Sequence, residues 1–308
     1  MNISFFSQAS TRTTELRTIR GASSKTQLIG HHAALFVALL GCSLAIFLLG
    51  ANYYGLFPTN GNTLYAASTT AVFLSAAIIF KRSKSSSRYW GITYAFFVAS
   101  AVNLISDLFG KFNSKFVDFF GLATDQNMVL GLGKLYDAML VVITILVLTV
   151  ISGENLGTLF LKIGNQYRKW GYGIGALILV NFFTSVLIFF GSGYALPKLG
   201  SAIAWGLVFS FSNSILEELW IRGLFLKKLV PLIGVGGTVL LTSMTFAALH
   251  FLGLAYLPAS VVPIFVANTF TMGLACGILM LKTDSIWGAF LIHAAADLFL
   301  WIATLASH

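Results

Sequence analysis

The sequence predicts an all-α protein, a polytopic bundle of about eight or nine transmembrane helices. Of its 308 residues, 57% are hydrophobic and only 9% are charged, whereas a soluble globular domain has about 25% charged residues. The mean hydropathy is +0.86. Apolar runs of the length needed to cross a bilayer, about 20 residues, recur along the chain. These observations exclude a soluble globular protein.

The spans follow one another with short connections. In order, we expect them at 33–56, 63–80, 89–108, 128–152, 171–192, 201–226, 234–252, 259–281 and 286–305. Residues 153–170 fit an interfacial amphipathic helix. This segment divides the chain into N-terminal helices of unassigned role, 31–160, and a C-terminal part, 161–308.

Basic residues lie mainly on one side of the predicted membrane. With the N-terminus in the cytoplasm, 14 of the 19 Lys and Arg residues fall in cytoplasmic segments, as the positive-inside rule requires. The net charge of +9 therefore indicates basic loops facing a lipid bilayer, and we expect no nucleic-acid partner. We predict a multi-pass protein of a cell (plasma or inner) membrane.

Residues 1–30 are basic and rich in Ser and Thr. We expect a cytoplasmic tail here, although an organellar transit peptide has a similar composition. Cys42 and Cys276 lie in apolar runs without metal-type spacing, so we interpret both as packing residues.

Several ionisable residues lie inside predicted spans. Such residues cost at least a few kcal/mol in a bilayer and are usually paired and often functional. Glu218 and Arg222 are four residues apart, on one helix face, and can form an ion pair. Glu217 points about 100° away and lacks Arg222 as a direct partner, so it is a candidate general base.

Two later spans repeat the four-residue spacing, with Phe246 before His250 and His293 before Asp297. Buried pairs of this kind can also serve only to hold helices together. For Lys134 and Asp137, which have no companion His, we expect a structural ion pair.

A carboxylate and two imidazoles meet the minimum for peptide hydrolysis, which needs a base for water, an acid for the leaving amine and donors for the oxyanion. No GxSxG nucleophile motif is present. His250, His293 and a glutamate could bind zinc, but HExxH is absent, so we expect no cofactor and do not favour a metal.

Three motifs in a fixed order, "EELWIR", "FAALH" and "HAAAD", fit EExxxR, FxxxH and HxxxN/D. Over roughly 171–305 the chain thereby resembles the CPBP family of CAAX prenyl proteases type II and bacteriocin-processing proteins, also called the Abi family. The resemblance implies a glutamate-dependent intramembrane endopeptidase whose substrate is a membrane-associated peptide or protein. Glu217 and His250 would activate water, and Glu218 and Arg222 would orient the site.

By the same resemblance, His293 and Asp297 would stabilise the oxyanion and position the scissile carbonyl. Many members have Asn where this chain has Asp297. An ionised carboxylate cannot donate a hydrogen bond, so Asp297 is either protonated or, as we expect, orients His293.

The glutamate pair lies roughly 15 Å along the helix from Lys227 and Lys228, so we expect cleavage inside the bilayer near the cytoplasmic face. A CAAX-like tail, a leader and a sorting peptide all remain open as substrates. The alternatives are a non-catalytic scaffold or immunity protein and a proton-coupled transporter. A transporter would favour internal repeats, which the sequence lacks.

Overall fold

The computed structural model describes residues 30–51, 57–121, 125–190, 196–250, 260 and 262–305. Every regular element within these ranges is helical, which confirms the all-α prediction. The predicted cytoplasmic tail lies outside the described residues, apart from its last residue.

The first helix, Gly30–Leu49, ends in a π-helical turn, η1 (Ala45–Leu49). The other long helices are α2 (Thr59–Arg82), α3 (Trp90–Phe109), α5 (Gln126–Ile151), α6 (Arg168–Phe190), α7 (Leu196–Glu217), α8 (Leu226–His250), α9 (Val262–Thr283) and α10 (Trp287–Leu305). The short elements are η2 (Ser87–Tyr89), η3 (Gly110–Phe112), α4 (Asn113–Phe119), η4 (Leu156–Leu159) and the π-helix η6 (Glu218–Gly223).

The long helices lie where the nine spans are predicted, because only a helix pairs all of its backbone polar groups within an apolar run. Six segments within the described ranges are long and apolar enough to cross a membrane. These include the first helix, α2, α3 with its short continuation, α5, α8 and α9. The helices α6, α7 and α10 lie at the positions of predicted spans. Their described residues are not both long enough and apolar enough to be counted among these six segments.

The connection between α5 and α6 differs from its prediction. Residues 153–167 form the short 3-10 helix η4 and a series of turns instead of an interfacial helix. Phe160 takes a left-handed conformation with φ 61° after η4. Its carbonyl accepts a hydrogen bond from the backbone N–H of Ile286, so this segment is held against the α9–α10 turn.

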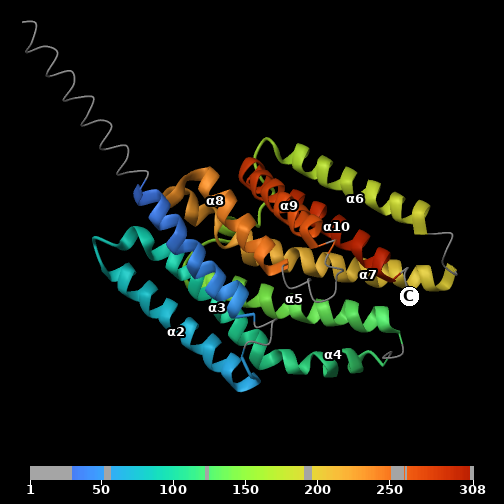
Figure 1. Cartoon of the computed structure of the whole chain (residues 1–308), viewed down its shortest axis with the longest axis horizontal. Coiled ribbons are helices and arrows are strands. Elements are labelled where there is room, and N and C mark those ends of the chain that lie inside the picture. The colour runs from blue at the N-terminus through green and yellow to red at the C-terminus, as the bar shows by residue number, and fades with distance from the viewer. Residues whose placement is uncertain are drawn as a thin grey trace, which may run out of the picture.

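Neighbouring helices pack in pairs, α2 with α3, α5 with α7, α8 with α9 and α6 with α10 (Figure 1). The α6–α10 contact depends on small residues. A Cβ atom on Gly175 would lie 2.9 Å from the carbonyl oxygen of Gly288, and one on Gly288 would lie 2.8 Å from that of Gly171. Such close approach is typical of membrane helices, whose association relies on packing.

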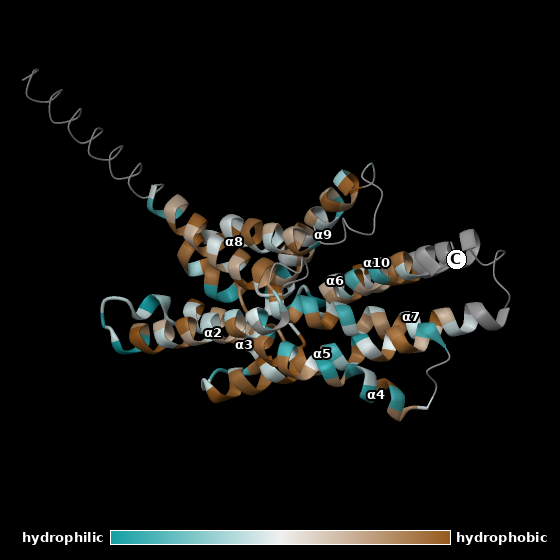
Figure 2. Cartoon of the chain, turned by 60° about the horizontal axis from the view of Figure 1, so that its bottom comes forward, coloured by the Kyte–Doolittle hydropathy of each residue, from teal (hydrophilic) through white to brown (hydrophobic). Residues whose placement is uncertain are grey.

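An aromatic cluster connects the N-terminal helices to the C-terminal part. The Phe47 ring lies 4.8 Å from that of Trp220, and the Phe96 ring lies 5.1 Å from that of Phe225. Trp220 also donates a hydrogen bond to the carbonyl of Ala99 on α3. Figure 2 shows hydrophobic residues along much of each helix and hydrophilic residues in the α2–α3 connection.

Three segments predicted to be cytoplasmic meet at one end of the bundle. Lys228 pairs with Glu154 at 2.8 Å, and Lys227 pairs with Asp284 at 2.7 Å. Lys162 pairs with the same aspartate. These contacts place the α5–α6 connection, the start of α8 and the α9–α10 turn on one side, as the positive-inside pattern requires.

Candidate active site

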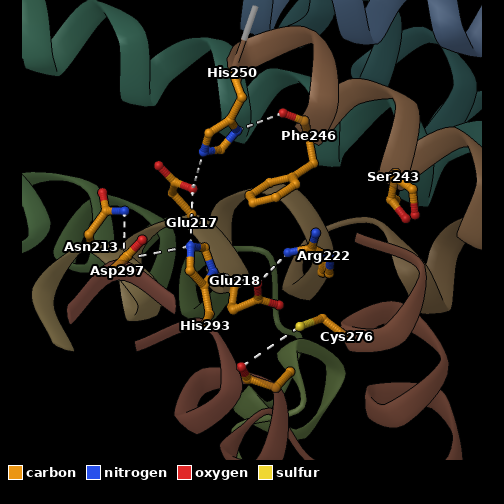
Figure 3. A network of polar contacts seen from close by, with 12 residues as sticks. Asn213, Glu217, Glu218, Arg222, Ser243, Phe246, His250, Cys276, His293 and Asp297 are labelled. Atoms are coloured by element: carbon orange, nitrogen blue, oxygen red, sulfur yellow. Dashed lines mark hydrogen bonds and ion pairs between the residues drawn. The ribbon is translucent and has the colours of Figure 1, made fainter. Parts of the chain in front are cut away.

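The seven residues of the three motifs come together at the meeting point of α7, η6, α8 and α10 (Figure 3). Glu217 ends α7, and Glu218 and Arg222 belong to η6. The other members come from two helices, Phe246 and His250 from α8 and His293 and Asp297 from α10.

The helix that carries the glutamate pair changes from α to π geometry at Glu218. The backbone N–H of Leu224 bonds to the carbonyl of Leu219, a five-residue step typical of a π-helix. All six residues of η6 are buried. Single π-turns of this kind are frequent at functional sites, and here the turn carries Glu218 and Arg222.

Glu218 accepts hydrogen bonds from two other residues of the site. Its Oε1 atom accepts a hydrogen bond from Arg222 Nη1 and another from His293 Nδ1, the latter at 2.8 Å. All three side chains are fully buried. The predicted Glu218–Arg222 ion pair is therefore present, and it also holds an imidazole. Since Nδ1 of His293 donates to a carboxylate, its Nε2 atom is the one available to the site.

His250 is oriented by its own helix. Its Nδ1 atom lies 2.9 Å from the carbonyl oxygen of Phe246, which leaves Nε2 facing Glu217. By sequence, His250 falls near the far end of its span. α8 is interrupted at Gly234, whose φ is 71°, three residues after Pro231. The helical segment after this break ends at His250, and His250 Nε2 lies 3.9 Å from Glu217 Oε2.

Glu217 lies between the two imidazoles and not in a purely apolar environment. Its Oε2 atom is 3.6 Å from His293 Nε2 and 3.9 Å from His250 Nε2. The Glu217 side chain is 19% exposed, whereas that of His293 is fully buried. Among the described residues, neither Glu217 Oε2 nor His293 Nε2 has a hydrogen-bond partner.

Phe246 packs between Arg222 and the two histidines. The Arg222 guanidinium carbon lies 4.3 Å from the centre of the Phe246 ring, a cation–π contact. The same ring lies 4.4 Å from the His250 ring and meets the His293 ring edge-to-face at 5.4 Å. Phe246 thus packs against three of the site residues at once.

Asp297 does not orient His293 in the way that we expected. The orienting bond to His293 Nδ1 comes from Glu218, and Asp297 Oδ2 lies 3.7 Å from Nε2, beyond hydrogen-bond distance. Asp297 instead accepts a hydrogen bond of 3.0 Å from Asn213 Nδ2. The sequence motifs do not include Asn213, although its place four residues before Glu217 puts both on one face of α7.

The expected ion pair between Lys134 and Asp137 is absent from the ion pairs of the described residues. Asp137 accepts a hydrogen bond from Asn113 at 3.1 Å, and the Lys134 ammonium lies 5.4 Å from the centre of the Phe209 ring. The predicted ion pair is therefore not formed, and each residue instead has a contact with another helix, Asp137 with α4 and Lys134 with α7.

Within the described ranges, no group of three or more His, Cys, Asp or Glu side chains is arranged to hold a metal ion. Cys276 lies buried nearby as a free thiol 3.8 Å from the carbonyl oxygen of Ala289. That contact fits the packing role predicted for it.

Comparison with known proteins adds one finding. Residues 198–299 match the family model described as type II CAAX prenyl endopeptidase Rce1-like. This range contains all seven motif residues and Asn213. No curated protein and no solved structure is significantly similar to the chain.

Proposed function

Because residues 198–299 match the family model of type II CAAX prenyl endopeptidases of the Rce1-like kind, we propose that the chain is a glutamate-dependent intramembrane endopeptidase. Its substrate would be a membrane-associated peptide or protein. In this proposal Glu217 and His250 activate water, His293 and Asp297 face the scissile peptide, and Glu218, Arg222 and Phe246 support them.

One observation carries this proposal, the convergence of Glu217 Oε2 with Nε2 of both histidines within 3.9 Å. Each histidine has its other nitrogen engaged, by Phe246 or by Glu218. Both imidazoles therefore direct Nε2 at the same carboxylate. Glu217 Oε2 and His250 Nε2 can accept hydrogen bonds from a water molecule about to be deprotonated, and a protonated His293 Nε2 can donate one to the substrate.

The reaction follows from these positions. Glu217 Oε2 takes one proton from water, and the water oxygen bonds to the scissile carbonyl carbon, giving a tetrahedral oxyanion. A protonated imidazole Nε2 of His293 donates a hydrogen bond to that oxyanion. The carbon–nitrogen bond then breaks as the Glu217 proton passes to the leaving amine. A carboxylic acid and an amine result, and the site regains its starting protonation.

The buried support would keep the acceptors in place. Glu218 fixes His293 through Nδ1, and Arg222 balances the negative charge of Glu218. An imidazole whose Nδ1 is held by a carboxylate presents Nε2 throughout the reaction. This arrangement supports hydrolysis because it directs Nε2 of His293 toward Glu217, which an ion pair between Glu218 and Arg222 alone would not do.

Two alternatives remain as outcomes of the test. A scaffold or immunity protein would bind partners without cleaving them, and a proton-coupled transporter would use the same ionisable groups as a relay. We keep the class of substrate open between CAAX-like tails, leaders and sorting peptides.

The test is cleavage of a quenched peptide library, including farnesylated CAAX peptides, by the purified protein in liposomes. We expect Glu217→Gln to fold normally and to lose at least about 10³-fold in kcat, because an amide cannot accept the proton of water. His250→Ala should lose less. Addition of a strong chelator should leave wild-type cleavage unchanged.

The controls separate the alternatives. Asp118→Asn, at an exposed position on α4 remote from the motifs, should cleave like the wild type. Full cleavage by Glu217→Gln would contradict the proposed base, and loss of cleavage with chelator would indicate a metal enzyme. Proton flux without cleavage would favour the transporter.

A further inference from the structure

Asp297 has a hydrogen-bond partner that the proposed reaction does not use. Asn213 lies on α7, one helical turn before Glu217, and is only 8% exposed. Its Nδ2 atom donates to Asp297 Oδ2 at 3.0 Å, across 84 residues of sequence. In Figure 3 the amide nitrogen of Asn213 lies on the side facing Asp297, while Glu217 and His293 lie next to the pair.

The Asp297 oxygen that accepts the hydrogen bond from Asn213 is also the one that faces His293. Asp297 Oδ2 lies 3.7 Å from His293 Nε2, several tenths of an ångström beyond a hydrogen bond. Both residues lie on α10 at a four-residue spacing, where side chains of a helix meet. A small rotation of an unrestrained Asp297 would therefore join it to Nε2.

That contact would change what His293 can do. Nδ1 is already bound to Glu218, so a second carboxylate on Nε2 would engage both ring nitrogens. An imidazole with both nitrogens engaged has none left for the carbonyl of a peptide. Nε2 of His293 is free of such a partner among the described residues, and the Asn213 hydrogen bond holds Asp297 toward α7.

We propose that Asn213 is a positioning residue that keeps Asp297 from hydrogen-bonding to His293, so that Nε2 of His293 stays available to the scissile peptide. The proposal deepens the proposed peptidase function and rests on it. It also gives a physical reason for pairing a carboxylate at position 297 with an amide at position 213. The Asn213 amide restrains the Asp297 carboxylate in a site that already contains the carboxylates of Glu217 and Glu218.

The first experiment is a double-mutant cycle on peptide cleavage. We expect Asn213→Ala to lower kcat by about 10- to 100-fold, the range found when partners that orient a histidine are removed, with little change in KM. In the Asp297→Asn background the same substitution should lower kcat by less than about threefold, because position 297 then has no carboxylate that Asn213 must restrain. An Asn213 that only fills space would cause equal losses in both backgrounds.

The second experiment does not depend on cleavage. Nitrogen-15 NMR of labelled histidines in detergent should show His293 Nε2 shifted toward a hydrogen-bonded position in Asn213→Ala and returned in Asn213→Ala with Asp297→Asn. Thermal unfolding of each variant verifies that it is folded. Equal kinetic losses in both backgrounds, or an unchanged His293 signal, would overturn the role of Asn213. A wild type that cleaves nothing would count against the proposed function, and the His293 signal would still decide the positioning role.

Discussion

Glu218 carries two hydrogen bonds on one oxygen, because Arg222 follows it by one turn and His293 reaches it from α10. Its position makes it a link between the helix of the glutamate pair and the last described helix. Glu217, which precedes Glu218 in the chain, faces different partners, the Nε2 atoms of His250 and His293. Two adjacent carboxylates thus have separate partners because successive helix positions point about 100° apart.

Substitution of Arg222 by Met should destabilise the protein by about 3–5 kcal/mol, because it leaves the fully buried charge of Glu218 without its ion-pair partner. Thermal unfolding in detergent measures this effect. Adding Glu218→Gln should recover part of the lost stability, since the uncompensated charge is then removed. A double variant that is less stable than Arg222→Met alone would contradict this interpretation.

Residue spacing predicted the members of the site but not all of their partners. The Glu218–Arg222 pair follows from a four-residue step along one helix. The bond from His293 to Glu218 spans 75 residues, and the bond from Asn213 to Asp297 spans 84. Such bonds depend on which helices are neighbours, and a single sequence of uniformly apolar spans carries little information about that.

At the scale of helices, positions were predictable because the length of an apolar run determines where the backbone must be helical. Local departures were not. The π-turn at Glu218–Gly223 occurs inside an apolar segment that was predicted as regular helix, whereas the break at Gly234 lies at the predicted start of a span. The π-turn packs through Trp220 against Phe47 on the first helix, a contact that the local sequence does not reveal.

The contact between α6 and α10 gives a test with a matched control on one helix. Gly175→Ala should lower the thermal stability by about 1–3 kcal/mol, because its Cβ would lie 2.9 Å from both the Gly288 carbonyl oxygen and the Leu291 Cβ. Gly173→Ala should be neutral or slightly stabilising, because a Cβ there meets nothing within 4 Å.

Thermal unfolding of the two variants in the same detergent makes the comparison. Since α10 carries His293 and Asp297, Gly175→Ala should also reduce cleavage, whereas Gly173→Ala should not. Equal stability of the two variants would show that α6 and α10 are less closely packed than described.

Across the whole molecule, one ionic cluster joins segments far apart in sequence. Asp284 contacts Lys162 from the α5–α6 connection and Lys227 from the start of α8. Burial acts to raise the pKa of Asp284, but the hydrogen bonds and charges of the two lysines outweigh it and hold this pKa below its ordinary value. The cluster thereby ties α8 to the turn that begins α10.

Stability should accordingly depend on this cluster in a defined pH range. A carboxyl whose pKa is lowered on folding stabilises the folded state above its unfolded pKa, about 3.9, and loses this effect as the pH falls through the lower folded value. We therefore expect Asp284→Asn to be less stable than the wild type at pH 6–7. The difference should shrink below about pH 4.

Thermal unfolding of both proteins between pH 3 and 7 measures this dependence. Asp284 has a φ of 53°, and Asn tolerates this left-handed conformation, so the substitution isolates the charge. A stability difference that stays constant over the whole range would contradict an ionic role for Asp284.

The site also has a consequence for how the protein is made. Glu217, His250 and His293 lie on three helices that leave the ribosome one after another, and α10, with His293 and Asp297, is the last of them. Under the proposed roles, a partly synthesised chain holds its base and one imidazole without the partner that completes the site. Under those roles, proteolytic competence would begin only when α10 has entered the bilayer and packed against α6, so the chain would be synthesised in an inactive form.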